Sequence, residues 1–299
     1  MTKPTIGFIG VGLMGHGMGL NILKGGYPLV VVAHRNRGPV EDLLANGATE
    51  AASIAELAAQ CDIIHICVSG SPQVEAVIGG EGGIAANARA GTIIVDCSTS
   101  DPVSTEQLAS MLAERGLALA DAPLGGTPAN AQAGTLGAMV GADDETFARI
   151  EPVLQSWAKN IVHLGPVGLG HKMKLINNFM SLGNAALLSE ALVLARKSGL
   201  SVEQFHKVIG SSRMHNGFYD TFMKWTMERD ENAHRFTITN AHKDMRYLSN
   251  LAVSVSAVNP VQSVIRNHLS AMEAAGKGEL FVPMLADFIA AMNGLDRED

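Results

Sequence analysis

The stretch "TIGFIGVGLMGHGM", residues 5–18, joins a short apolar run to a helix-like run through closely spaced glycines. Gly10, Gly12 and Gly15 have the spacing Gly-x-Gly-x-x-Gly, directly after an expected strand and at the start of an expected helix. In that context the first glycine permits a tight turn, the second lets the backbone approach a pyrophosphate, and the third packs the helix on the strand. The stretch therefore predicts a dinucleotide site at the start of the helix. The predicted phosphate-binding residues are Gly10, Gly12, Leu13, Met14 and Gly15.

The first half of the chain continues this alternation of strands and helices. Strand-like runs span 5–10, 29–34, 62–68, 91–98, 117–123, 136–141 and 160–165. Helix-like runs span 13–25, 40–46, 53–60, 72–78, 104–115 and 144–158. Repeated β–α units predict a mostly parallel sheet with helices on both faces. From residue 166 only helical patterns follow, beginning with a long helix from about 170 to 198. We therefore expect an α/β Rossmann-type domain over 1–165 and an all-α domain over 166–299.

Composition excludes several classes of function. The net charge is −7, which argues against nucleic acid as a partner because phosphate binding needs basic surfaces. The three cysteines, Cys61, Cys67 and Cys97, have no metal or disulfide spacing and predict reduced thiols and no metal site. We see no secretion signal and no run of about 18 apolar residues. These features predict a cytoplasmic protein that does not span a membrane.

The segment "VVVAHRNRG", residues 30–38, indicates which dinucleotide is bound. A site for NAD usually places an acidic residue on the ribose about 20 residues after the glycines. Here the strand ends at His34, and Arg35, Asn36 and Arg37 follow. Two guanidinium groups could hold a 2′-phosphate by forked hydrogen bonds, which favours NADP(H) and leaves NAD(H) possible. The alternative is that one or both arginines are solvated loop residues.

The segment "KMKLINNFMS", residues 172–181, places polar groups inside an apolar helix. At about 100° per residue, Lys174, Asn177, Asn178 and Ser181 share one face, whereas Lys172 points away. Adjacent asparagines are poor helix formers, so the pattern favours a function. The amides and hydroxyl could bind a substrate, and the lysine could donate or accept a proton. The alternative is a polar seam between domains.

Four blocks in order give a resemblance that covers essentially the whole chain. They are "GFIGVGLMG" (7–15), "DAPLGGTPANAQAGTL" (121–136), "GLGHKMKLINNFMS" (168–181) and "FTITNAHKDMRYL" (236–248). Together they resemble the β-hydroxyacid dehydrogenase family, which includes 3-hydroxyisobutyrate dehydrogenase, and most closely its sulfolactaldehyde reductase-like branch. The resemblance implies an NAD(P)H-dependent oxidoreductase that interconverts a short aldehyde acid and its hydroxy acid. It also implies that residues 166–299 form the substrate and dimerisation domain of a homodimer or homotetramer.

The resemblance also implies roles for individual residues. Lys174 matches the catalytic lysine, the general acid when a carbonyl is reduced. Asn178 matches the asparagine that holds the substrate, and Asn177 and Ser181 match polar positions beside it. The remaining matches concern the dinucleotide: Val68 and Ser69 over the adenosine half, Thr99 beside the nicotinamide ribose, and Phe236 and Lys243 near the nicotinamide and substrate.

One loop departs from the family pattern. Most members have Ser-Gly-Gly where this chain has Gly125, Gly126 and Thr127, and the sulfolactaldehyde branch has an arginine at the position of Gly126. Backbone N–H groups of residues 125–127 could still bind an anion. The expected substrate is therefore a small anionic aldehyde or hydroxy acid whose acid group, carboxylate or sulfonate, stays open. Two alternatives are a reductase of a different carbonyl or an imine on the same fold, and a nucleotide-binding protein without catalysis.

Overall fold

The computed structural model describes residues 3–295 and divides the chain into two compact units. Unit 1 comprises Met1–Lys174 and unit 2 comprises Leu175–Asp299. The division falls inside the long helix α9 (Leu169–Lys197), later than the predicted boundary between residues 165 and 166. The reason is that the first turns of α9 make their hydrogen bonds and ion pairs with unit 1.

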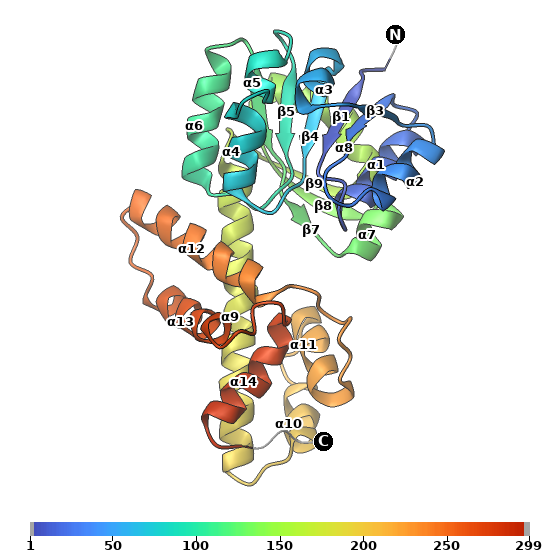
Figure 1. Cartoon of the computed structure of the whole chain (residues 1–299). Helices are drawn as coiled ribbons and strands as arrows, with labels where there is room; N and C mark the ends of the chain where they lie inside the picture. Colours follow the sequence, from blue (N-terminus) through green and yellow to red (C-terminus); the bar gives the residue numbers. More distant parts are fainter. Residues whose placement is uncertain (1–2, 296–299) are drawn as a thin grey trace. The chain divides into compact units, whose positions relative to one another are not determined.

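Unit 1 is built on a nine-stranded sheet with the order β3-β2-β1-β4-β5-β6-β8-β7, and β9 pairs with β8 (Figure 1). The first six strands in this order pair in parallel, whereas β8 runs antiparallel to β6 and β7. The mostly parallel sheet that the sequence predicts is thus confirmed. The strands are β1 (Ile6–Ile9), β2 (Leu29–Val32), β3 (Thr49–Ala51), β4 (Ile63–Ile66), β5 (Ile93–Asp96), β6 (Ala118–Asp121), β7 (Leu124–Gly125), β8 (Leu136–Gly141) and β9 (Ala158–Gly165).

Helices cover both faces of this sheet and form two separate apolar layers. In β5, Ile93 and Val95 enter the layer that contains Met18 and Trp157, whereas Ile94 enters the opposite layer. A strand buried on both faces must be apolar throughout, which explains the uninterrupted β-branched runs. The helices of unit 1 are α1 (Gly15–Lys24), α2 (Gly38–Ala45), α3 (Ile54–Gln60), α4 (Ser71–Gly79), α5 (Ile84–Asn87), α6 (Pro102–Ala113), α7 (Pro128–Ala133) and α8 (Asp144–Trp157).

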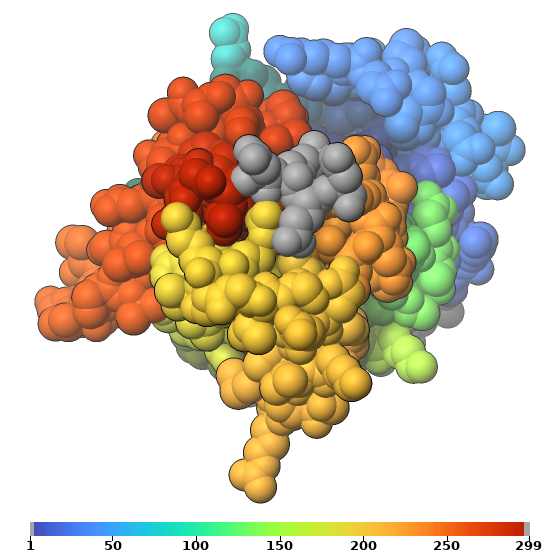
Figure 2. All heavy atoms as spheres, turned by 90° about the horizontal axis from the view of Figure 1, so that it is seen from below, coloured from blue at the N-terminus to red at the C-terminus, as the bar shows by residue number. Residues whose placement is uncertain are grey.

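Unit 2 is helical, as predicted, and its core gathers around aromatic side chains. Tyr219, Phe222 and Trp225 of one helix are buried against the apolar face of α9 and the last helices of the chain. Figure 2 views this unit from the end of α9, with the end of α9 and α10 in yellow and α14 in red. Besides α9 its helices are α10 (Val202–Ile209), α11 (Gly217–Glu228), α12 (Ile238–Ser254), α13 (Pro260–Ala274) and α14 (Leu285–Met292), with a 3-10 turn at Val282–Met284.

Helix α9 has the length that the sequence predicts, about 170 to 198, but it is more apolar than that analysis allowed. An 18-residue window of it has a mean hydropathy of 1.3, so its length and composition are sufficient to cross a membrane. The core helix of a soluble protein meets the same criterion, and 44% of this window is buried inside the protein.

Candidate active site

The glycine loop between β1 and α1 has the geometry that the sequence predicts. Gly10 has a φ of 97°, and a Cβ there would lie 2.2 Å from the carbonyl oxygen of Cys67. A Cβ at Gly15 would lie 2.2 Å from the carbonyl oxygen of Gly10. A Cβ at Gly12 would meet nothing within 4 Å. The first and third glycines are therefore required by the fold itself, whereas the bare backbone at Gly12 leaves open space that fits a bound pyrophosphate.

The first turn of α1 suits an anion. Met14, at its N-cap, makes no side-chain hydrogen bond, and this turn contains no acidic residue. Backbone N–H groups at a helix start then remain directed at a ligand. The loop lies at the carboxyl end of β1, next to β4, where the strand order reverses. Open α/β sheets bind nucleotides at this point.

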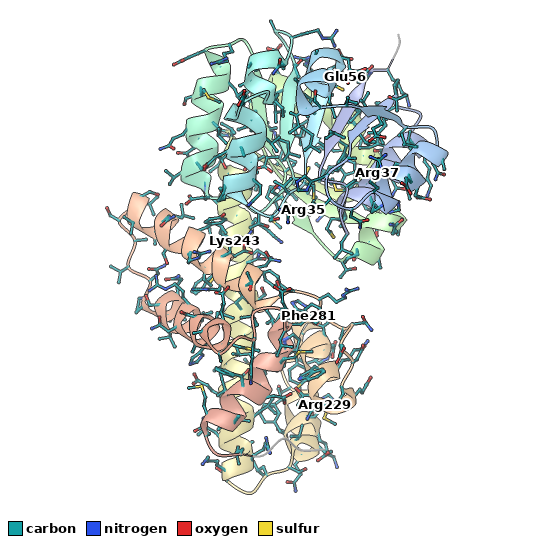
Figure 3. All side chains as sticks on the ribbon, viewed as in Figure 1. Arg35, Arg37, Glu56, Arg229, Lys243 and Phe281 are labelled. Carbon is teal, nitrogen blue, oxygen red and sulfur yellow. The ribbon has the colours of Figure 1, made fainter. Side chains whose placement is uncertain are left out.

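The two arginines of the loop after β2, Arg35 and Arg37, have different surroundings (Figure 3). Arg37 donates from Nη1 and Nη2 to the two carboxylate oxygens of Glu50, each at 3.0 Å. This forked pair raises the pKa of Arg37 and lowers the pKa of Glu50. Arg35 is exposed and makes no hydrogen bond or ion pair with any residue from 3 to 295. Arg35 is therefore the guanidinium that is available for an anion, a distinction that the sequence analysis missed because β3, which carries Glu50, was not predicted.

The other predicted nucleotide contacts of unit 1 lie at the same edge of the sheet. His34 and Asn36 are exposed beside Arg35, and the Asn36 side chain accepts from the backbone N–H of Gly38 at 3.2 Å. Val68 and Ser69 follow β4, and Thr99 follows β5. Because β1, β2, β4 and β5 are parallel, these loops and the glycine loop all leave from their carboxyl ends.

Lys174 is half-buried on α9 and its ammonium is directed to the substrate loop predicted from the sequence. Its Nζ donates to the carbonyl oxygen of Leu124 at 2.8 Å, immediately before Gly125. Lys172 points elsewhere, and its Nζ lies 2.6 Å from Oε1 of Glu106. The helix therefore separates its two lysines as the periodicity predicts.

The substrate loop itself contains no cation and uses its threonine structurally. The backbone N–H and the hydroxyl of Thr127 donate to Oδ1 of Asn130 at 3.0 and 2.8 Å, which caps α7. Gly126 has a φ of 120°, a conformation that strains any residue with a side chain. Gly125 belongs to β7 and pairs with Gly137. The Thr127 hydroxyl thus bonds Asn130 in this structure, and its contact with a substrate stays a prediction.

Unit 2 holds a second polar group, which includes a residue that the sequence analysis missed. Asn178 is 6% exposed, and its Nδ2 donates to Oδ2 of Asp244 at 2.7 Å. Oδ1 of Asp244 lies 3.2 Å from Nζ of Lys243 in an ion pair, although it receives no well-directed hydrogen bond. Ser181 donates its hydroxyl back to the carbonyl of Asn178 at 3.1 Å. In the sequence, the available signal for Asp244 was an acidic residue directly after Lys243 in "HKD", residues 242–244.

Two further predicted residues of unit 2 have simpler surroundings. Asn177 is exposed, and its Nδ2 lies 3.5 Å from Oδ1 of Asn178. Phe236 packs against the apolar core of unit 2. The contact of Phe236 and Lys243 with a nucleotide stays a prediction.

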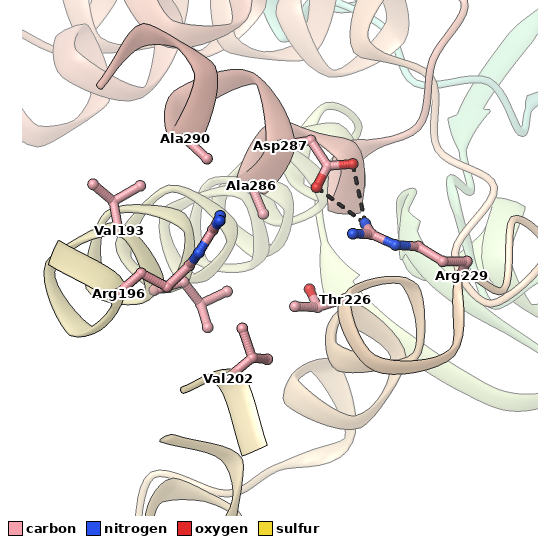
Figure 4. A pocket seen from close by; sticks show the side chains of 9 residues that line it. Val193, Arg196, Val202, Thr226, Arg229, Ala286, Asp287 and Ala290 are labelled. Carbon is pink, nitrogen blue, oxygen red and sulfur yellow. Dashed lines mark hydrogen bonds and ion pairs between the residues drawn. The ribbon is translucent and has the colours of Figure 1, made fainter. Parts of the chain in front are cut away.

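A small cavity in unit 2 lies apart from these groups (Figure 4). Its volume is about 30 Å³, which is room for about two water molecules. Arg229 and Asp287, whose Nη1 and Oδ1 are 3.0 Å apart, line it together with the hydroxyl of Thr226. This cavity is too small for a dinucleotide. Within residues 3–295 no cluster of three or more His, Cys, Asp or Glu side chains could hold a metal ion.

Comparisons with known proteins agree with this geometry. Residues 5–165 match the family model of the NAD binding domain of 6-phosphogluconate dehydrogenase, and residues 168–284 match that of the NAD-binding of NADP-dependent 3-hydroxyisobutyrate dehydrogenase. The chain is 38% identical to 2-(hydroxymethyl)glutarate dehydrogenase of Eubacterium barkeri, over 80% of this chain and 79% of that protein. It is 32% identical to 3-sulfolactaldehyde reductase of Escherichia coli (strain K12), over 91% of each.

The fold agrees with a solved structure over nearly its full length. The structure of Mycobacterium tuberculosis 3-hydroxyisobutyrate dehydrogenase with L-serine has a TM-score of 0.86 and 25% identity, covering 96% of this chain and 99% of that one. The chain belongs to the β-hydroxyacid dehydrogenase family, whose members are NAD(P)-dependent oxidoreductases that interconvert hydroxy acids and semialdehydes.

Proposed function

We propose that this protein reduces a short aldehyde that carries an acid group to the corresponding hydroxy acid with NADPH, and that Lys174 supplies the proton. The observation that carries the proposal is the 2.8 Å bond from Lys174 Nζ to Leu124 O. This bond fixes an ammonium beside the loop that begins at Gly125. The bound dinucleotide supplies the hydride, and the protein supplies position and charge.

Lys174 has two tasks in this reaction. Its ammonium gives a proton to the carbonyl oxygen as that oxygen becomes an alkoxide, and its positive charge stabilises the developing negative charge. In the reverse direction the neutral amine accepts the proton from the hydroxyl group. The carbonyl of Leu124 accepts one of the ammonium hydrogens and thereby orients the group.

Asn178 presents a defined side of its amide to the substrate. A carboxylate can only accept hydrogen bonds, so Asp244 fixes the Nδ2 side of Asn178 toward itself. Oδ1 of Asn178 then remains as an acceptor for a hydroxyl group. Asn178 lies one turn after Lys174 on α9, so the two groups share a face of one helix. We propose that this pair orients the substrate and that the backbone of Gly125 and Gly126 binds its acid group, because the backbone N–H of Thr127 already donates to Asn130.

We propose that NADPH is preferred to NADH and that Arg35 binds its 2′-phosphate. The free guanidinium of Arg35 supports this, as does the match of residues 168–284 to an NADP-dependent enzyme family. A hydrogen bond to a charged group contributes about 1.5–3 kcal/mol, so Arg35→Ala should weaken NADPH binding about 10- to 150-fold with little change for NADH. Arg37→Ala is the matched control, because Arg37 is already held by Glu50. An unchanged ratio of the two dissociation constants in Arg35→Ala would refute the assignment.

We further infer that the chain forms a homodimer or homotetramer. Met180, Leu187 and Leu194 of α9 are 65%, 59% and 68% exposed and repeat every seven residues. Such a spacing places them in one stripe along the helix, which supports packing against another copy. Light scattering after size exclusion should give a mass of two or four chains, reduced in Leu187→Glu. A monomeric wild-type protein would contradict this inference.

A substrate panel tests the proposed activity. Succinic, methylmalonic and tartronic semialdehydes, glyoxylate and sulfolactaldehyde should be offered with NADPH, and with NADH as the control. We expect saturable NADPH oxidation with at least one of them and slower oxidation of uncharged aldehydes of the same length. Preference for uncharged aldehydes would contradict the proposed substrate class.

A further inference from the structure

His171 is fully buried at the start of α9 and has no part in the reaction proposed above. Its Nδ1 lies 2.8 Å from the hydroxyl oxygen of Thr105, and its Nε2 lies 3.2 Å from the carbonyl oxygen of Ser98. Two carboxylates flank the ring. Oδ2 of Asp96 is 3.7 Å from Nε2, and Oδ2 of Asp121 is 3.7 Å from Nδ1.

The partners of the ring indicate where its hydrogens lie. The carbonyl oxygen of Ser98 can only accept, so Nε2 of His171 must carry a hydrogen. The hydroxyl of Thr105 has one hydrogen, which it donates to the carbonyl oxygen of Asp101 at 3.1 Å. Nδ1 of His171 is the other neighbour of this hydroxyl, at 2.8 Å. Donation of the hydroxyl hydrogen to Asp101 leaves the Thr105 oxygen to accept from Nδ1, and this arrangement places hydrogen on both ring nitrogens.

We infer that His171 is a buried imidazolium whose charge, held between Asp96 and Asp121, makes it a positioning residue for Lys174. This inference rests on the proposed function only for its effect on Lys174. The charge state of His171 stands independently of that function.

A cation at residue 171 would balance the charges of this cluster, in which Asp96 also accepts hydrogen bonds from the backbone N–H of Ser98 and the hydroxyl of Ser100. The side chains of Asp96 and Asp121 are 2% and 0% exposed. Burial raises the pKa of Asp121, while the charge of His171 and backbone hydrogen bonds oppose the rise. Within residues 3–295, no basic group other than His171 lies within 4 Å of either carboxylate. The nearby Glu106 is already paired with Lys172. A neutral residue 171 would leave buried carboxylates without a counter-charge, which is costly.

Asp121 connects this cluster to the start of α9. Its carboxylate accepts from the backbone N–H groups of Gly168 and His171, each at 2.6 Å. It thereby satisfies donors that the helix start leaves unpaired. Lys174 follows one turn later, and its ammonium is held by the carbonyl of Leu124, three residues after Asp121. A shift of the helix start therefore moves the proton donor, and a displacement of about 1 Å can reduce a rate about 10²-fold.

Neutron diffraction from crystals of the wild-type chain at neutral pH tests the charge directly. We expect deuterium on both Nδ1 and Nε2 of His171. One bare ring nitrogen would overturn the inference. This measurement needs no variant and no substrate.

Kinetics of His171→Gln test the positioning role. We expect kcat to fall about 10- to 100-fold, with KM and the NADPH dissociation constant unchanged, because Lys174 is displaced while the binding groups remain. His163→Gln is the control: this half-buried histidine of unit 1 bonds the carbonyl of Ala142 and faces the exposed Asp144. Equal kcat values in the two variants, or a raised KM with unchanged kcat in His171→Gln, would contradict a positioning role.

A double-variant cycle separates charge from shape. Asp96→Asn should lower the melting temperature in the wild-type background but restore part of the stability and kcat in His171→Gln, because it removes the uncompensated negative charge. Additive losses would contradict the charge argument. The cycle in melting temperature does not involve the reaction. If Lys174→Ala keeps its activity while the cycle is non-additive, the proposed function fails and the charged cluster stands.

Discussion

Replacing Asp244 by asparagine removes one negative charge from the polar group of unit 2 with little change in shape. The side chains of Asp244 and Lys243 are 2% and 14% exposed, so neither has much water to replace a lost partner. The ammonium of Lys243 would lose the carboxylate oxygen that lies 3.2 Å from it. The amide of Asn178 would face another amide, and its orientation would no longer be fixed by an acceptor-only partner.

The expected cost follows from this burial. Breaking a buried ion pair by removing one partner costs about 3–5 kcal/mol. Asparagine still offers an oxygen to Asn178, so the lower end, about 3 kcal/mol, applies. A change of that size lowers the melting temperature by about 6–12 °C, at roughly 2–4 °C per kcal/mol. The loss of the fixed amide of Asn178 should lower kcat/KM about 10- to 150-fold, which corresponds to about 1.5–3 kcal/mol.

The assay compares Asp244→Asn with Asp220→Asn by thermal denaturation and NADPH oxidation. Asp220 also has a basic partner, His215 at 2.7 Å, but its side chain is 51% exposed. An exposed pair contributes about 0.2–1 kcal/mol, so this control should shift the melting temperature by less than about 4 °C. If the two variants have the same melting temperature and the same kcat/KM, the reasoning about Asp244 is refuted.

Two other predictions concern unit 1. Gly12→Ala should keep the wild-type melting temperature, because its Cβ meets no protein atom within 4 Å, but it should weaken NADPH binding. Gly15→Ala should unfold at a lower temperature, because its Cβ would lie 2.2 Å from a backbone oxygen. Equal melting curves of the two variants would contradict this. Burial lowers the pKa of His65 from 6.5 to about 3. Below pH 6.5 the imidazole of His65 becomes protonated in the unfolded chain but stays neutral in the folded chain. The free energy of unfolding therefore falls by on the order of 4 kcal/mol as the pH decreases from above 6.5 toward 3. His65→Phe should flatten this part of the curve of melting temperature against pH, and an unchanged slope would contradict the assignment.

The sequence predicted those elements whose residues carry a strong local pattern. The central strands of unit 1 are continuous β-branched runs, and α9 has an apolar period over its whole length. Strand β3 was not predicted, because "TEA", residues 49–51, has two exposed residues and lies at the edge of the sheet. Strand β7 has two residues, too few for any period.

The candidate site divides in the same way. The glycine loop and the separation of Lys172 from Lys174 follow from local spacing, so they could be predicted. The pairing of Arg37 with Glu50 depends on the register of β2 and β3, and the bond from Asn178 to Asp244 joins residues 66 positions apart. Contacts between segments that are distant in the sequence produce no periodic pattern of residues. These two pairs could therefore be identified only from the structure.

The most direct test of the central claim is kcat of Lys174→Ala beside Lys172→Ala at saturating NADPH. Lys172 belongs to the same helix but pairs with Glu106, so its loss should leave the rate nearly unchanged. Loss of a general acid lowers the rate about 10²- to 10⁴-fold, and we predict a fall of that size for Lys174→Ala with an unchanged NADPH dissociation constant. A Lys174→Ala variant that binds NADPH and turns over as fast as Lys172→Ala would contradict the account.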